Sequence, residues 1–254
     1  MSFESILIEK PAQGVALIRL NRPHQYNALN SELLTELATA LDQFEHDEKI
    51  GAVILTGSEK FFAAGADIAE MFGKNSQELA DLFNRSAGWT AISAFGKPTI
   101  CAVSGLALGG GFELALQCDI LLATTGARFA LPEVNLGVIP GAGGTQRLTK
   151  LIGKSLAMEM VLNARPLLAD EALQRGVVSR VIEPDQLELE AIELAREIAN
   201  RAPMAVHSGK QCVNKAMMST LEKGLEFEQQ TFFPLFDSTD AKRLMEEFLN
   251  KSKT

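Results

Sequence analysis

The chain of 254 residues is poor in the residue types that build metal centres and disulfide scaffolds. It contains three histidines and three cysteines. Cys101, Cys118 and Cys212 lie in apolar contexts without a CxxC pair, so we expect them to be reduced. The histidines are scattered and none has a partner at metal-ligand spacing. The sequence therefore argues against a disulfide framework, and no metal site is expected.

Basic charge and long apolar runs are also lacking. The net charge is −8 and the isoelectric point is near 5.1, whereas nucleic-acid-binding domains usually carry a basic stripe. No uninterrupted apolar run reaches the roughly 18 residues of a membrane span. Residues 1–5 contain no basic segment ahead of an apolar core, so no signal peptide is expected. These absences predict a cytoplasmic protein without nucleic-acid or membrane partners.

What the chain does contain is an alternation of short β-type runs and helical periodicity. Residues 6–9 and 15–20, separated by a turn signal at 11–14, predict a hairpin. A helix is predicted over residues 33–44, with Asn30 or Ser31 as its N-cap. Further strands are expected at residues 52–57, 99–105, 120–123 and 177–182. This alternation is typical of an α/β fold with parallel pairing.

Two other predictions concern the organisation of the chain. Residues 61–67 are small and rich in glycine and alanine, and we interpret them as a tight turn leading into a helix near residues 68–71. From residue 155 onward the pattern is mainly helical, which predicts an α/β core over residues 1–195 and a helical region over 196–254.

Three familiar motifs are incomplete. Leu148 stands where a P-loop needs its first glycine, and Gln146 stands where a dinucleotide-binding turn needs its third. Ser104 is flanked by Ala102 and Leu106 where a nucleophile elbow requires glycines. The sequence thus offers neither a phosphate-binding loop nor a serine nucleophile of these types.

Two glycine-dense segments, residues 105–113 and 132–145, each contain one glutamate in apolar company. Glu113 and Glu133 are therefore candidates for a raised pKa and for proton transfer. Small residues at 63–67 and 109–111 allow backbone N–H groups to face a ligand, as an oxyanion hole requires. The combination predicts an active site made of two carboxyl groups and backbone donors.

Each feature has a plainer interpretation when it is taken alone. Glu113 suits the first turn of a helix, and Glu133 suits a capped or salt-bridged loop. Residues 109–111 could serve close helix packing, and Asp67 could be a helix N-cap. Only the occurrence of all four in one chain favours catalysis.

At these residues the sequence resembles the enoyl-CoA hydratase (crotonase) family over nearly its whole length. The similarity is sharpest in three segments, Phe62–Asp67, Gly105–Glu113 and Pro132–Leu148. The resemblance implies an α/β fold, a crotonase-like spiral of repeated ββα units, with a helical C-terminal region that drives trimerisation. A homotrimer or a homohexamer formed as a dimer of trimers is therefore expected.

The resemblance also implies roles for individual residues. The amides of Ala64 and Gly110 would hold the thioester carbonyl oxygen of an acyl-CoA. Glu113 would activate a water for attack at Cβ, and Glu133 would deliver a proton to Cα. Gly141 would help to position that water through its backbone.

Substrate-binding residues follow from the same resemblance. Those expected to contact the CoA moiety are Asn27, Ala28, Leu29, Ala66, Asp67 and Ile68. Phe248 and Lys251 match C-terminal positions that reach the CoA of a neighbouring subunit. No cofactor is implied, since coenzyme A is part of the substrate. Phe112 and the pair Arg243-Leu244 depart from the common pattern of the family.

The presence of both glutamates favours one reaction within the family. It predicts hydration of a trans-2-enoyl-CoA to a 3-hydroxyacyl-CoA, in fatty-acid or aromatic-acid degradation. The alternative enzyme is a Δ3-Δ2-enoyl-CoA isomerase or another acyl-CoA enzyme of the same fold. The alternative of another class is an RNA-binding member of the family, which the acidic isoelectric point disfavours.

Overall fold

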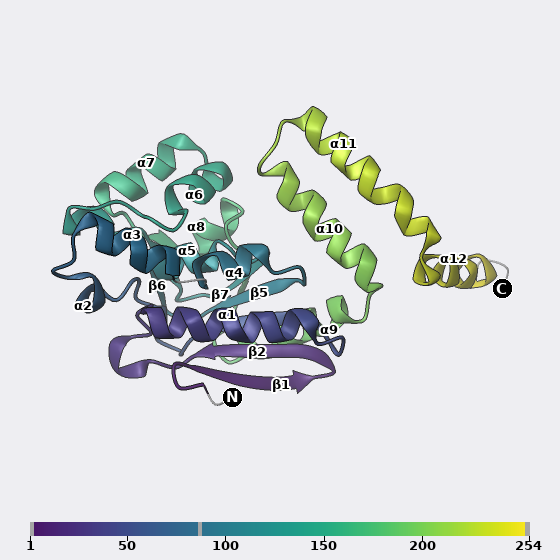
Figure 1. The fold of residues 1–254 in the computed structure, drawn as a ribbon, viewed down its shortest axis with the longest axis horizontal. Coiled ribbons are helices and arrows are strands. Elements are labelled where there is room, and N and C mark those ends of the chain that lie inside the picture. The colour runs from purple at the N-terminus through teal and green to yellow at the C-terminus, as the bar shows by residue number, and fades with distance from the viewer. Residues whose placement is uncertain (1–2, 86–87, 252–254) are drawn as a thin grey trace.

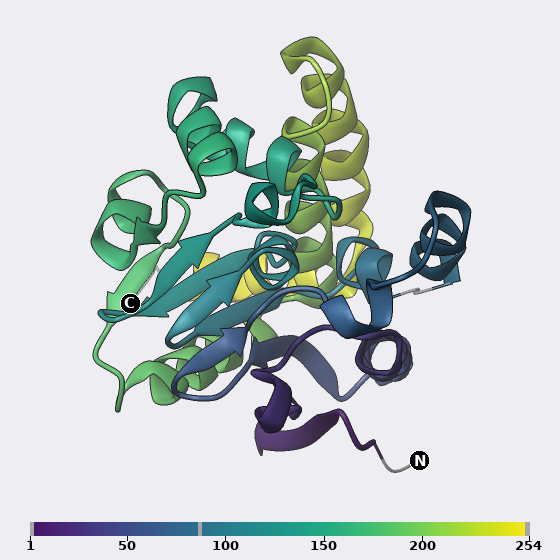
Figure 2. The ribbon, with the colours of Figure 1, turned by 90° about the vertical axis from the view of Figure 1, so that its left-hand side faces the viewer.

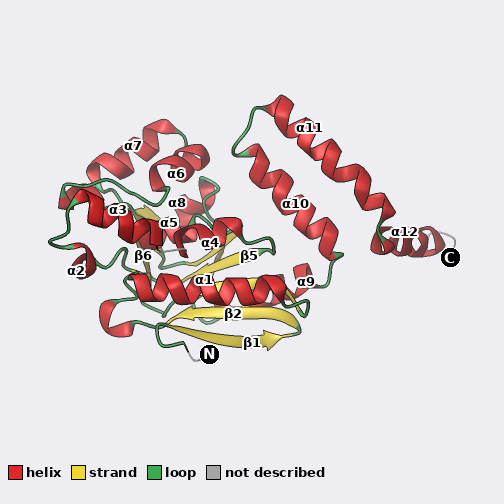
Figure 3. Cartoon of the chain, viewed as in Figure 1, coloured by secondary structure: helices red, strands yellow, loops and turns green. Residues whose placement is uncertain are grey.

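The computed structural model describes residues 3–85 and 88–251, and it contains two β-sheets. The larger sheet has six strands in the order β1-β2-β3-β5-β7-β10 and the smaller has four in the order β4-β6-β8-β9 (Figure 1, Figure 3). The strands of the large sheet are β1 (Ile6–Ala12), β2 (Gly14–Leu20), β3 (Ile50–Thr56), β5 (Thr99–Val103), β7 (Ile120–Thr124) and β10 (Arg180–Ile182). Those of the small sheet are β4 (Phe61–Ala63), β6 (Leu106–Leu108), β8 (Arg128–Ala130) and β9 (Leu167–Leu168).

The predicted hairpin and the predicted parallel pairing are both confirmed. β1 and β2 are antiparallel, and β2, β3, β5, β7 and β10 then pair in parallel. The hairpin turn is tighter than residues 11–14, because β1 continues to Ala12 and Gly14 takes a φ of +80°. A positive φ costs glycine little, so the chain reverses within two residues.

The two sheets are linked by a repeated connection. Each of β3, β5 and β7 in the large sheet is followed by β4, β6 or β8 in the small sheet and then by a helix. This is the expected spiral of ββα units. The interpretation of residues 61–67 as a turn was wrong for Phe61–Ala63, which form a short strand because they pair with β6. The helix expected after them is present as α2 (Ile68–Met71).

Helices cover both faces of the large sheet (Figure 2). α1 (Ser31–His46) begins where the sequence predicted, since the Asn30 side chain accepts a hydrogen bond of 3.0 Å from the Leu33 amide. α9 (Leu187–Ala199) packs on the opposite face, with Leu187, Ala191 and Ala195 buried there. Successive strand residues alternate between these two apolar layers, as a pleated strand requires.

The remaining helices surround the small sheet or extend beyond the core. They are η1 (Pro23–Gln25), α3 (Ser76–Arg85), α4 (Gly88–Ala94), α5 (Gly110–Ala115), η2 (Glu133–Leu136), α6 (Gly144–Ile152), α7 (Lys154–Asn163), α8 (Ala169–Gln174), α10 (Pro203–Ala216), α11 (Leu221–Phe232), η3 (Phe233–Asp237) and α12 (Thr239–Lys251). None of the helices in the described part of the chain is long and apolar enough to cross a membrane.

Residues 203–251, which we call the C-terminal arm, extend away from the core as α10, α11 and α12 (Figure 1). The predicted boundary between residues 195 and 196 falls inside α9. The division of the chain at that point stays a prediction.

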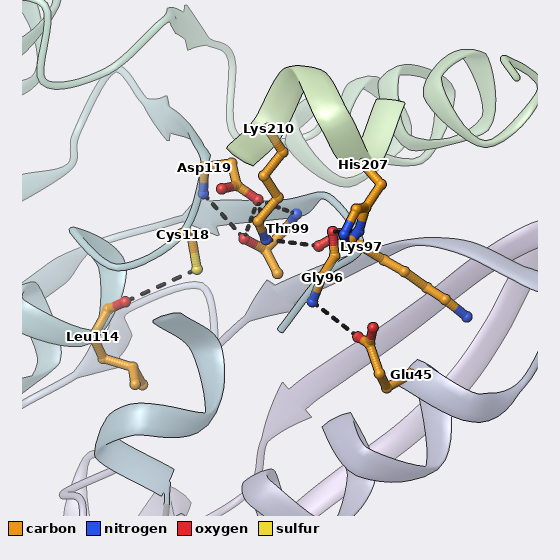
Figure 4. Close-up of polar contacts among 9 residues, drawn as sticks. All are labelled: Glu45, Gly96, Lys97, Thr99, Leu114, Cys118, Asp119, His207 and Lys210. Carbon is orange, nitrogen blue, oxygen red and sulfur yellow. Dashed lines mark hydrogen bonds and ion pairs between the residues drawn. The ribbon is translucent and has the colours of Figure 1, made fainter. Parts of the chain in front are cut away.

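A cluster of polar contacts fastens the arm at its base (Figure 4). Lys210 on α10 forms an ion pair of 2.8 Å with Asp119 and donates to the Lys97 carbonyl, also at 2.8 Å. His207 Nδ1 lies 3.0 Å from the Gly96 carbonyl oxygen. Asp119 also accepts hydrogen bonds of 2.8 Å from the amide and the hydroxyl of Thr99, so it anchors the first residue of β5 as well.

Candidate active site

The first glycine-rich segment forms the turn between β6 and α5. Gly109 caps the helix with φ 49° and ψ −126°, and its amide donates to the Ala130 carbonyl at 2.8 Å. A methyl group on Gly110 would lie 2.9 Å from Cη2 of Trp89 and 3.2 Å from the Ala66 nitrogen. A methyl group on Gly111 would lie 2.4 Å from the Ala63 carbonyl oxygen. Glycine is therefore required here so that β4 and α5 can approach each other.

Glu113 lies in the first turn of α5, as the plainer interpretation proposed, but its carboxylate points into the protein. The residue is 2% exposed. Its Oε1 atom accepts hydrogen bonds from the amides of Ala142 at 2.8 Å and Gly144 at 2.7 Å. Burial raises the pKa of Glu113, while the amides of Gly144, Ala142 and Gly141 act in the opposite direction. Backbone amides of the second glycine-rich segment thus bind the carboxylate of Glu113, which belongs to the first segment.

Glu133 is the first residue of η2 and lies on the other side of the same turn. A methyl group on Gly109 would lie 2.9 Å from its Oε1 atom. Its Oε2 atom is buried, with no hydrogen-bond partner among the described residues. Burial, and to a smaller extent the charge of Glu113, raises the pKa of Glu133 to about 7. Near neutral pH the protonated and the ionised forms of the Glu133 carboxyl group are therefore both populated.

The amides expected to form the oxyanion hole are not equally available. The Ala64 amide donates to the Tyr26 carbonyl at 3.0 Å. The Gly110 amide is the first of α5 and has no intrahelical acceptor, as is usual at a helix N-terminus. The backbone nitrogen of Ala66 lies close to Gly110. Within the described residues, neither the Ala66 amide nor the Gly110 amide donates a hydrogen bond to a backbone acceptor. The pair of unengaged donors is therefore Ala66 and Gly110.

Two of the predicted CoA contacts, Asn27 and Leu29, belong to the turn that supports this pair. Asn27 is 1% exposed, and its side chain is fully used within the protein. It accepts from the Arg22 amide at 2.9 Å and donates to the Phe62 carbonyl at 3.1 Å. Leu29 is buried and its amide donates to the Gly65 carbonyl at 2.7 Å. Asn27 and Leu29 are therefore enclosed by the protein, and their contact with CoA stays a prediction.

Arg22 organises this region, although sequence reasoning assigned it no role. Its guanidinium donates to the Ala28 carbonyl and forms an ion pair of 3.0 Å with Asp67. Asp67 is the N-cap of α2, as the alternative interpretation proposed, since it accepts from the Ala69 amide at 3.1 Å. The only sequence signal for Arg22 is its position in the Asn-Arg-Pro segment directly after β2.

The other predicted substrate contacts lie at the surface. Ile68 is 49% exposed beside the turn. Phe248, which is 73% exposed, and Lys251 lie on α12 at the far end of the arm (Figure 1). They are remote from α5 within one chain, so their proposed contact requires a neighbouring subunit. The roles of all three residues stay predictions.

A further network that the sequence did not reveal joins three helices of the site. Ser93 on α4 accepts a hydrogen bond of 2.9 Å from Arg147 on α6 and donates one of 2.8 Å to Gln117, just beyond α5. Trp89 lies on α4, Gly144 on α6 and Glu113 on α5, so the network connects the helices that form the site. No group of three or more metal-ligating side chains occurs in the described residues.

Comparison with known proteins agrees with this geometry. The enoyl-CoA hydratase/isomerase family model matches residues 10–254. A probable enoyl-CoA hydratase of Rhizobium meliloti is 47% identical over 100% of this chain and 98% of its own length. A short-chain-enoyl-CoA hydratase of Clostridium acetobutylicum is 42% identical over 100% and 97%. The crystal structure of an enoyl-CoA hydratase from Bacillus anthracis superposes with a TM-score of 0.92 and 36% identity, covering 97% of this chain and 96% of that one.

The chain therefore belongs to the enoyl-CoA hydratase/isomerase family and has the crotonase fold. The family resemblance seen in the sequence is confirmed. The prediction of an enzyme of the enoyl-CoA hydratase type is confirmed by the same relatives.

The environment of Glu133 predicts a pH-dependent effect on stability. Its pKa is higher in the folded state, about 7, than the ordinary value of about 4.3 expected in the unfolded chain. The folded protein therefore binds more protons between these values, so this group's contribution to stability falls as pH rises through about 7. Glu133→Gln should raise the free energy of unfolding at pH 8 by about 1 kcal/mol, after allowance for solvent screening.

Urea denaturation of both proteins at pH 8 and at pH 4.5 checks this prediction. The difference in the free energy of unfolding between Glu133→Gln and wild type should be smaller at pH 4.5, where Glu133 is protonated in the folded state. Glu183→Gln, at an exposed position, is the control and should change neither value by more than about 0.5 kcal/mol. A variant less stable than wild type at pH 8 would contradict the argument.

Proposed function

We propose that the protein catalyses the hydration of trans-2-enoyl-CoA thioesters to 3-hydroxyacyl-CoA. The observation that carries this proposal is a pair of carboxyl groups, those of the buried Glu113 and the half-buried Glu133, on either side of the Gly109–Gly111 turn. Hydration adds a hydroxyl group at Cβ and a proton at Cα, and two carboxyl groups in different protonation states suit these two tasks. The names of the relatives support the same reaction.

We propose Gly110 and Ala66, rather than Gly110 and Ala64, as the donors to the thioester oxygen. The Ala64 amide already has the Tyr26 carbonyl as its acceptor, whereas the other two amides are adjacent and unengaged. Two N–H groups aimed at one oxygen stabilise the enolate that forms when a nucleophile attacks Cβ. The position of Gly110 at the start of α5 adds the favourable field of the helix N-terminus.

In this scheme Glu113 is the base and Glu133 the acid. Glu113, whose carboxyl group accepts hydrogen bonds from the amides of Ala142 and Gly144, takes a proton from water as the hydroxyl group bonds to Cβ. Glu133, whose pKa is about 7, gives its proton to Cα. Gly141 would orient the water through its backbone. Exchange with solvent then restores both carboxyl groups, so the reaction consumes only water.

The broader setting follows from the same chemistry. Coenzyme A enters as part of the substrate, and the scheme requires no other cofactor. We place the reaction in fatty-acid or aromatic-acid degradation in the cytoplasm. An isomerase would need only one proton-carrying group, so the paired carboxyls favour the hydratase. RNA binding is disfavoured by the net charge of −8.

Replacing either glutamate tests the acid–base roles. Glu113→Gln and Glu133→Gln should each lower kcat at least 100-fold, since each removes a proton-transferring group. Acyl-CoA binding should change by less than about tenfold. The loss of ultraviolet absorbance of crotonyl-CoA measures turnover, and calorimetric titration with a saturated acyl-CoA measures binding. More than a tenth of wild-type turnover in Glu133→Gln would refute its role, and Glu183→Gln serves as the exposed control.

Gly110 offers a matched pair of variants for the oxyanion hole. Proline is tolerated at the first position of a helix and removes the N–H, whereas alanine keeps the N–H and adds a methyl group at the same place. Gly110→Pro should therefore have a kcat about 10²–10³-fold below that of Gly110→Ala. Gly126→Ala, where a methyl group meets nothing within 4 Å, should match wild type. Equal kcat values for the two folded Gly110 variants would exclude a donor at this position.

We also propose that the C-terminal arm mediates assembly into a trimer or a dimer of trimers. Large apolar side chains are exposed along it, at Leu221, Leu225, Phe232, Phe233, Phe236, Phe248 and Leu249. Exposed apolar surface of this extent usually marks an interface. Between the base of the arm and the β1–β2 turn lies a cavity of about 930 Å³, distant from the two glutamates, which leaves further surface for a neighbouring chain.

Light scattering after size-exclusion chromatography tests the assembly. The expected mass is three or six times the monomer mass of 27.5 kDa. Phe233→Asp should shift the population to smaller species, because it places a charge in the interface. Leu189→Asp, at an exposed position on α9, should not. A monomer at micromolar concentration would contradict the proposal.

A further inference from the structure

The loop that binds the Glu113 carboxylate lies against the side chain of Arg147. The amides of Ala142 and Gly144 donate to Glu113 Oε1 at 2.8 and 2.7 Å. Gly143 lies between these two donors, and a methyl group on it would stand 3.2 Å from Nε of Arg147. Gly143 takes a φ of +108°, which glycine adopts without steric cost. The Arg147 side chain thus packs against the residue that sets the direction of both donors.

The guanidinium of Arg147 is anchored on α4. Its Nη2 atom donates to the Ser93 hydroxyl oxygen at 2.9 Å, and that hydroxyl group donates to Gln117 Oε1 at 2.8 Å. A hydroxyl group can accept one hydrogen bond while it donates another. Ser93 therefore fixes the end of the Arg147 side chain and is itself oriented by Gln117.

Gln117 is a costly residue for its position. It is 7% exposed, and its Nε2 atom is buried without a hydrogen-bond partner among the described residues. A buried donor without a partner destabilises a protein, and an apolar side chain of similar size would avoid that penalty. What glutamine provides here is the acceptor for Ser93. Such exceptions to polar satisfaction often serve a functional site.

This network joins the parts of the site that must be placed relative to one another. Arg147 belongs to α6, whose first residues bind Glu113. Ser93 belongs to α4, which also carries Trp89, and Cη2 of Trp89 would lie 2.9 Å from a methyl group on Gly110. A shift of about 1 Å between reacting groups can cost on the order of 10²-fold in rate. A fixed distance between α4 and α6 therefore matters for catalysis.

We propose that Arg147 is a positioning residue for Glu113. Anchored through Ser93, it keeps residues 142–144 in the shape that presents two amides to the carboxylate. The proposal rests on the proposed hydratase function, in which Glu113 activates the water. Arg147 touches no reacting atom in that scheme, so its effect falls on kcat and not on substrate binding.

Two substitutions of Arg147 test this role. Arg147→Met keeps the apolar stem over Gly143 and removes the donor to Ser93, whereas Arg147→Lys keeps a donor. Arg147→Met should lower kcat about 10- to 100-fold. KM should change by less than about threefold, because the ground-state contacts remain. The kcat of Arg147→Lys should lie between those of Arg147→Met and wild type. Arg175→Met, at an exposed position, is the control and should match wild type.

The pH profile separates positioning from a general loss of structure. The amide hydrogen bonds favour the ionised form of Glu113, so loosening them raises its pKa. A base must be ionised to act, and the acid limb of kcat/KM should therefore move to higher pH in Arg147→Met, by about half a unit or more. The basic limb, set by Glu133, should stay where it is in wild type.

A double-mutant cycle tests the anchor. Ser93→Ala removes the acceptor of Arg147 and should also lower kcat. If both residues act through their hydrogen bond, the double variant should be no slower than Arg147→Met alone. Losses that multiply in the double variant would overturn the anchoring through Ser93.

Hydrogen exchange measured by mass spectrometry gives a readout that does not depend on catalysis. The peptide covering residues 142–144 should exchange faster in Arg147→Met than in wild type or Arg175→Met. Unchanged exchange, or a wild-type kcat with an unshifted acid limb in Arg147→Met, would overturn the positioning role. Absence of hydration by wild type with every enoyl-CoA would instead overturn the proposed function, and the exchange rates would still decide whether Arg147 holds the loop.

Discussion

The burial of one carboxylate, that of Glu113, is the constraint on which the rest of the site depends. A charged group is costly to bury unless hydrogen bonds compensate it. The compensation comes from the amides of Ala142 and Gly144, so the start of α6 must lie against α5. A methyl group on Gly144 would stand 3.0 Å from the carboxylate oxygen, which explains why the second segment is also rich in glycine. The chemistry and the packing of these helices are thus set by the same contacts.

Much of the fold could be predicted because long elements have a period and a cap. α1 combined apolar spacing with Asn30, and the central strands β3, β5 and β7 of the large sheet are apolar on both faces. The small sheet could not be predicted in this way, since strands of two or three residues such as β9 and β4 are too short to show a period. Their pairing depends on partners that are distant in the sequence.

The site was predictable in its residue types and less so in its details. The two glutamates and the glycine turn follow from composition and spacing, but which amide is already engaged does not. Tyr26 and Asn27 adopt φ values of 52° and 57°, and this unusual backbone directs the Tyr26 carbonyl to Ala64. Non-glycine residues rarely take such angles, so the sequence alone does not show that the Ala64 amide already has an acceptor. The contact of Arg147 with Ser93 likewise depends on how helices meet in space.

The attachment of the C-terminal arm connects it with the strand that leads to the Gly109 turn. Asp119 binds Lys210 of the arm and also the first residue of β5, Thr99 (Figure 4). β5 runs directly into β6 and from there into the Gly109 turn. The base of the arm and the Gly109 turn are therefore joined through one carboxylate and the short continuous segment that runs from Thr99 to Gly109.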